Sequence, residues 1–152
     1  MPSTVDLAVV IIANLMNLLL ALMFLCRAWN KPKAGQAAGW AAVGLAIPLA
    51  VAVVLNLLSH RGWPYWLLPL FMIAYCLLEL LFDGILKVDF RHNRLLGPYL
   101  VVYYLGLMAM IGYAFLVGKV YGFITLITYF INLAATAYSY ARVGHGEMES
   151  VD

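Results

Sequence analysis

Residues 7–27 read LAVVIIANLMNLLLALMFLCR, an apolar run that carries its only charge at its last position. A helix needs about 20 such residues to cross the roughly 30 Å hydrocarbon core of a bilayer. The run is too long for the core of a cleavable signal peptide, so we expect it to stay as a first span. Four similar runs follow, and the five expected spans are residues 7–27, 35–59, 64–86, 98–117 and 120–141.

The composition agrees with a chain that lies mostly in lipid. Hydrophobic residues make up 66% of the 152 residues, charged residues make up 11%, and the mean hydropathy is +0.95. A typical soluble domain is about half apolar and about a quarter charged. So few charges exclude a soluble globular enzyme, a disordered tail, a nucleic-acid-binding protein and a disulfide-stapled secreted domain. The sequence therefore predicts an all-α integral membrane protein.

The breaks between the runs are short and contain proline or glycine, as turns do. We therefore expect residues 1–143 to form a single domain, a compact bundle of five transmembrane helices. The tightest break is Gly118-Lys119, which makes the last two spans an antiparallel hairpin. Residues 144–152 are expected to form a short, acidic and disordered cytoplasmic tail.

Basic residues predict the orientation of the bundle, because they gather on the cytoplasmic side. With the N-terminus outside, only Arg61 and Lys119 lie outside. The cytoplasmic side then holds seven basic residues: Arg27, Lys31, Lys33, Lys87, Arg91, Arg94 and Arg142. The opposite orientation inverts this ratio, so we expect the N-terminus outside and the C-terminus in the cytoplasm. Tyr99 is expected in the aromatic belt at the cytoplasmic headgroup level.

Polar residues on the first and last spans repeat at helical spacing. The last span carries Thr125, Thr128, Asn132, Thr136 and Ser139, at spacings of three, four, four and three. These positions fall within an arc of about 80°, and such a stripe must face protein or water. Asn14 and Asn17 on the first span, three residues apart, are expected to face the same interior. The stripe is either hydrogen-bonding glue between helices or the wall of a polar cavity.

The third span carries an acidic residue well inside the membrane. Tyr75, Glu79, Asp83 and Lys87 stand four residues apart, so an uninterrupted α-helix would place them in one stripe. Glu79 lies roughly 10 Å above the cytoplasmic end of that helix. Ionisable residues at such depth usually face the bundle interior. We expect Glu79 to be protonated, hydrogen-bonded to Asn17, Asn132 or a tyrosine, or paired with a bound cation.

Together these features predict an intramembrane polar pocket, enclosed by the first, third and fifth spans and centred on Glu79. Its expected ligand is an amphipathic, lipid-like or cationic small molecule, which the protein binds and in one version of the hypothesis translocates. The candidate ligand-binding residues are Glu79, Asp83, Asn17, Asn132, Tyr75, Asn14 and Thr128. Arg91, His92 and Arg94 form either a headgroup clamp beside Asp83 or an ordinary basic anchor on anionic lipid.

Two other functions stay open. The first is a structural or assembly subunit, in which the polar stripes are glue and a ridge from Ala38 to Ala50 docks a partner. In this ridge the alanines recur every four residues, and Pro48 is expected to kink the span. The second is a small lipid-modifying enzyme that uses Glu79 and Asp83.

Nothing in the sequence supplies a recognised nucleophile, so an enzyme is the least favoured function. Three scattered histidines and two separated cysteines indicate neither a metal nor a cofactor. The expected partners are membrane lipids and either further copies of the chain or a membrane complex. The expected location is a plasma or inner membrane, with an organelle membrane as the alternative.

Overall fold

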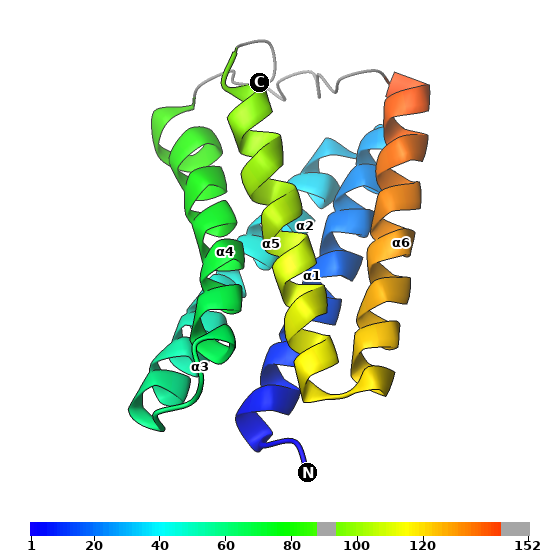
Figure 1. Cartoon of the computed structure of the whole chain (residues 1–152). Helices are drawn as coiled ribbons and strands as arrows, with labels where there is room; N and C mark the ends of the chain where they lie inside the picture. Colours follow the sequence, from blue (N-terminus) through cyan, green and yellow to red (C-terminus); the bar gives the residue numbers. More distant parts are fainter. Residues whose placement is uncertain (88–93, 144–152) are drawn as a thin grey trace.

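The computed structural model describes residues 1–87 and 94–143, and every regular element in these ranges is a helix (Figure 1). The elements are α1 (Thr4–Ala28), α2 (Pro32–Gly44), α3 (Ala46–Leu58), α4 (Pro64–Glu79), a π-helical end η1 (Leu80–Leu86), α5 (Leu96–Val117) and α6 (Lys119–Val143). Five of the helical segments are long and apolar enough to cross a membrane, with α2–α3 and α4–η1 each counted as one. The all-α class and the five long apolar helices are therefore confirmed. The predicted tail, residues 144–152, lies outside the described residues.

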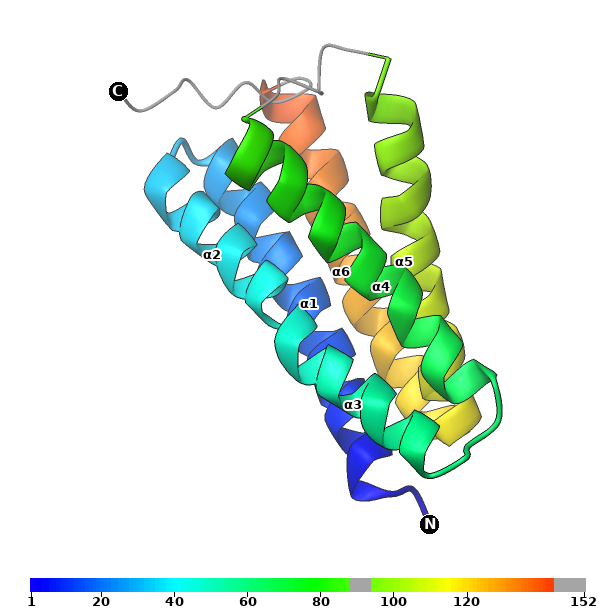
Figure 2. The ribbon, with the colours of Figure 1, turned by 90° about the vertical axis from the view of Figure 1, so that its left-hand side faces the viewer.

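Helix α1 is the centre of the bundle and packs against α2, α3, α5 and α6 (Figures 1 and 2). Within its apolar window 61% of the residues are buried, against 28% in the second and third segments. Val9, Met16 and Leu20 recur on its buried face at helical spacing and are almost fully enclosed. The sequence does not rank the spans in this way, because all five are similarly apolar.

Helices α4 and α5 approach closely at Gly106. A Cβ added at Gly106 would lie 3.2 Å from the Cα of Met72 on α4. Small residues allow such backbone contact, which stabilises helix pairs where no hydrophobic effect operates between them. Helix α5 in turn packs against α6, from which only Gly118 separates it, as the predicted hairpin requires.

The second segment is broken at Leu45, between α2 and α3. Pro48 explains the position of the break, because a proline lacks the N–H and its ring clashes with the carbonyl four residues earlier, here that of Gly44. The predicted kink is confirmed, whereas docking of a partner on the predicted alanine ridge stays a prediction. Ala42 is buried, whereas Ala46 is half-buried and Ala50 is exposed, because the break turns the second half of the ridge outward.

The third segment changes its helical type at Leu80. The π-helical hydrogen bonds of η1 join residues five apart, so the spacing of four no longer keeps residues on one face. Glu79 is buried, Asp83 is half-buried and Lys87 is exposed, with a left-handed φ of 47°. The acidic stripe predicted on an uninterrupted α-helix therefore ends at Glu79.

Candidate functional site

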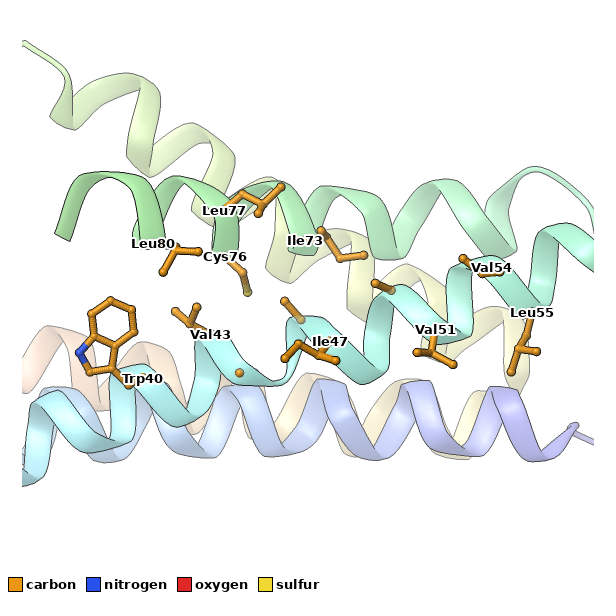
Figure 3. A pocket seen from close by; sticks show the side chains of 13 residues that line it. Trp40, Val43, Ile47, Val51, Val54, Leu55, Ile73, Cys76, Leu77 and Leu80 are labelled. Carbon is orange, nitrogen blue, oxygen red and sulfur yellow. The ribbon is translucent and has the colours of Figure 1, made fainter. Parts of the chain in front are cut away.

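A groove of about 740 Å³ opens on the side of the bundle between α2–α3 and α4 (Figure 3). Thirteen residues line it, and none of them is charged. Gly44, Ala46 and Ala50 supply the hollow because their side chains are small or absent. Ile47 on α3 and Leu77 on α4 stand 72% and 58% exposed at its rims, so the groove faces outward from the bundle. Its volume lies within the range of ligand sites, about 300–1,000 Å³.

Trp40 closes the groove at the end where α2 begins. Its indole ring lies against the backbone of η1, since a Cβ at Gly84 would lie 2.8 Å from the Cη2 atom of Trp40. Leu80 on η1 and Cys76 on α4 continue the opposite wall of the groove beside the indole (Figure 3). The groove was missed by the sequence argument, although the break at Pro48 beside two alanines was a usable signal.

Glu79 belongs to a separate cluster of tyrosines between α4, α5 and α6. The Tyr99 hydroxyl donates a hydrogen bond to Glu79 Oε2 and lies 3.5 Å from the hydroxyl of Tyr75. The Tyr75 and Tyr103 rings meet edge to face at 5.0 Å, and Asn132 donates to the Tyr103 hydroxyl over 3.0 Å. A tyrosine is thus one of the partners of Glu79, as one of the alternatives proposed.

The remaining predicted polar residues join α1 to α6. Asn14 donates to Thr125 over 3.1 Å and accepts from the Thr128 hydroxyl over 2.7 Å. Asn17 donates to Thr128 over 3.0 Å. These contacts are hydrogen bonds between adjacent helices, the interpretation that the sequence favours for the threonines. Within the described part of the chain, the buried Oδ1 atoms of Asn17 and Asn132 have no hydrogen-bond partner.

The predicted ligand-binding residues therefore lie mainly in two clusters, one around Glu79 and one between α1 and α6. None of these residues lines the groove. Helix α5 supplies Tyr99, which contacts Glu79 on α4, and Tyr103, which contacts Asn132 on α6. Arg91 and His92 of the predicted headgroup clamp lie outside the described residues, and Arg94 is exposed just before α5. Among residues 1–87 and 94–143, no three metal-ligating side chains gather.

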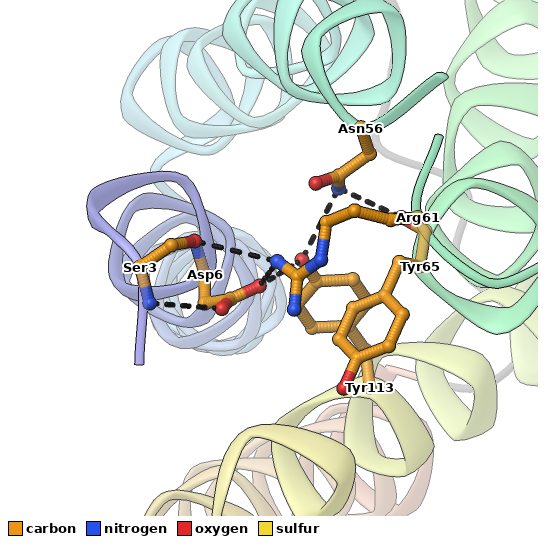
Figure 4. Close-up of polar contacts among 6 residues, drawn as sticks. All are labelled: Ser3, Asp6, Asn56, Arg61, Tyr65 and Tyr113. Carbon is orange, nitrogen blue, oxygen red and sulfur yellow. Dashed lines mark hydrogen bonds and ion pairs between the residues drawn. The ribbon is translucent and has the colours of Figure 1, made fainter. Parts of the chain in front are cut away.

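A third polar cluster ties four helices together at the opposite end of the bundle (Figure 4). Arg61, between α3 and α4, forms an ion pair of 2.5 Å with Asp6 on α1. Asp6 also accepts a hydrogen bond of 2.9 Å from Tyr113 on α5. Asn56 on α3 donates to the Tyr113 hydroxyl over 3.3 Å and to the backbone carbonyl of Tyr65 on α4 over 2.9 Å.

Local structure holds the two charges of this cluster in place. Ser3 caps α1 and exchanges hydrogen bonds with Asp6, a capping box. The Arg61 guanidinium lies 3.8 Å from the centre of the Tyr65 ring. Burial alone would lower the pKa of Arg61, but the hydrogen bond and charge of Asp6 outweigh burial and raise this pKa above its ordinary value. Arg61 therefore stays cationic at any usable pH.

This cluster is not among the sites predicted from the sequence, although the sequence carries a signal for it. The predicted orientation places Asp6 and Arg61 at the same end of the bundle, with opposite charges. Comparisons of the chain with protein-family models, with curated proteins and with solved structures found no match. The function is therefore argued from the geometry of the residues.

Proposed function

We propose that the chain is a multi-pass membrane protein that binds the hydrocarbon part of an amphipathic, lipid-like molecule in the groove between α2–α3 and α4. Large apolar side chains are exposed on the outer faces of the bundle, for example Ile11, Val101 and Ile127, each 59% exposed. Soluble monomers rarely expose wide apolar patches. This exposure supports a bundle surrounded by hydrocarbon.

The apolar groove is the observation that carries the proposal. A surface hollow in a bilayer is in contact with acyl chains, and this one has no charged side chain to exclude them. Because lipid is as apolar as the groove wall, the hydrophobic effect gives little affinity there. Van der Waals contact with a matching chain gives the selectivity instead, since each missing contact forfeits attraction.

Charges support the orientation with the N-terminus outside. In the described part of the chain, exposed cations stand at the end where α2 begins and η1 ends, among them Lys31, Lys33 and Lys87. At the other end Lys119 is exposed and Arg61 is paired with Asp6, so fewer exposed cations stand there. The positive-inside rule then places the Trp40 end of the groove at the cytoplasmic face.

The test fills the groove and measures how much lipid stays bound after purification in mild detergent, by native mass spectrometry. Ala50→Phe places a ring in the hollow, and Gly44→Leu is a second filling variant, because a Cβ at Gly44 meets nothing within 4 Å. Ala134→Phe adds the same ring at an exposed alanine of α6 and is the matched control.

We expect the wild type and Ala134→Phe to retain lipid, and both filling variants to lose it while keeping their thermal stability. Equal retention in all four proteins would refute the proposal. A second copy of the chain or another protein crosslinked into a lipid-free groove would favour an assembly subunit instead.

A further inference from the structure

Polar residues continue the line of the groove toward the beginning of α2. Lys33, Gln36 and Trp40 follow one another at spacings of three and four, so they share one face of α2. Val43 and Gly44, three and four residues beyond Trp40, continue the same face and line the groove. This face of α2 therefore changes from polar to apolar at Trp40, as an amphipathic ligand requires.

Trp40 marks the point of change with a hydrogen-bond donor. Figure 3 shows its indole nitrogen on the side away from Ile47, facing the end where α2 begins. Trp40 is 39% exposed, so its N–H can reach a group outside the bundle. Tryptophan has an apolar body and a polar N–H, and it favours the headgroup level of a membrane.

The groove is longer than the hydrocarbon core of one leaflet is deep. From Trp40 to Leu55 it follows 15 residues of α2–α3, roughly 22 Å at 1.5 Å per residue. One leaflet contributes about half of the roughly 30 Å hydrocarbon core. A chain whose headgroup lies beside Trp40 would therefore stay in the groove down to the bilayer midplane and beyond.

We infer that the ligand is an anionic phospholipid. Its phosphate lies beside Lys33, Gln36 and the indole N–H of Trp40, and one acyl chain lies along the groove. This inference rests on the proposed function and names the headgroup. At the opposite end of the groove Asn56, the residue after Leu55, uses its amide for Tyr65 and Tyr113.

The test offers the protein three headgroups at once. Purified full-length protein is equilibrated in vesicles of equal parts phosphatidylglycerol, phosphatidylethanolamine and phosphatidylcholine with identical acyl chains, and the retained lipid is identified by native mass spectrometry. We expect retained lipid to be mainly phosphatidylglycerol. Lys33→Ala should reduce this preference about fivefold, the effect of one lysine near an anionic surface. Trp40→Phe keeps a ring over Gly84, loses the N–H and should reduce the preference severalfold.

Two control variants separate a site from a diffuse surface charge. Lys31→Ala removes a neighbouring cation that precedes α2, and Lys119→Ala removes one at the other end of the bundle. Both should keep the preference. Equal losses in Lys31→Ala and Lys33→Ala would overturn the inference.

The headgroup assignment and the proposed function fail in different ways. Wild-type protein that retains all three lipids equally overturns the assignment and leaves lipid binding intact. A preference for phosphatidylethanolamine also overturns it. Protein that retains no lipid of any headgroup overturns both.

Discussion

Arg61→Ala removes the cation that forms an ion pair with Asp6. In the variant the Asp6 carboxylate stays inside the bundle, where its side chain is 4% exposed. Bulk water therefore cannot replace the missing guanidinium as its partner. Two donors remain to it, the Ser3 backbone N–H at 3.0 Å and the Tyr113 hydroxyl at 2.9 Å. The variant therefore tests how strongly the cluster joins α1 to the connection between α3 and α4.

The expected loss of stability follows from how far the Arg61 and Asp6 side chains are exposed to solvent. Breaking a fully buried ion pair costs about 3–5 kcal/mol, and an exposed pair contributes about 0–1 kcal/mol. The Arg61 side chain is 27% exposed and Asp6 keeps two donors, so Arg61→Ala lies between these limits. We expect a loss of about 1–3 kcal/mol in the free energy of unfolding.

The assay is thermal or chemical unfolding in a mild detergent, with a double-mutant cycle. Arg61→Ala and Asp6→Asn are measured singly and together, and Lys119→Ala controls for removing an exposed cation at the same end of the bundle. The cycle should give a coupling energy of at least about 1 kcal/mol between Asp6 and Arg61. A coupling near zero, or equal effects of Arg61→Ala and Lys119→Ala, would refute this account of the cluster.

Three further predictions concern the helix interfaces and the carboxyl group. Gly106→Ala should destabilise the bundle by about 1–3 kcal/mol, because its Cβ would press on the α4 backbone. Gly112→Ala, whose Cβ would lie 3.8 Å from its nearest neighbour, should be neutral or stabilising. Unfolding curves of the two variants compare these effects directly. Thr128→Val should cost about 0.6 kcal/mol per lost hydrogen bond between α1 and α6, and an unchanged melting temperature would count against these contacts. Glu79→Gln can still accept from Tyr99, and Glu79 does not line the groove, so the variant should keep the fold and retain as much lipid as the wild type; a loss of retained lipid would contradict this separation of Glu79 from the groove.

The five helices could be predicted because bilayer thickness fixes the length of an apolar run. Residues 7–27 and 98–117 already have that length, and the structure extends each run by a few residues only. The polar contacts of α1 with α6 were also accessible, since Asn14 and Thr128 lie on regular helical faces. In an uninterrupted helix the 3.6-residue repeat is enough to predict which way a side chain points.

The groove, and the separation of the predicted site residues into two clusters, could not be predicted from the α-helical repeat alone. Pro48 breaks the helix at Leu45, and a break rotates every later residue by an amount that the sequence does not state, so Ala50 faces outward. The change to η1 likewise moves Asp83 off the line of Glu79. The contact of Tyr99 with Glu79 was not predicted either, because the packing partner of each helix depends on the whole bundle.

The central claim is that hydrocarbon occupies the groove more tightly than the rest of the bundle surface. The most direct measurement uses a phospholipid with a photoactivated carbene group in its acyl chain, and maps the labelled residues by mass spectrometry. The account predicts labelling of residues 43–55 and 73–80 well above that of the equally apolar outer face of α6, residues 123–131. Even labelling of both surfaces would contradict it.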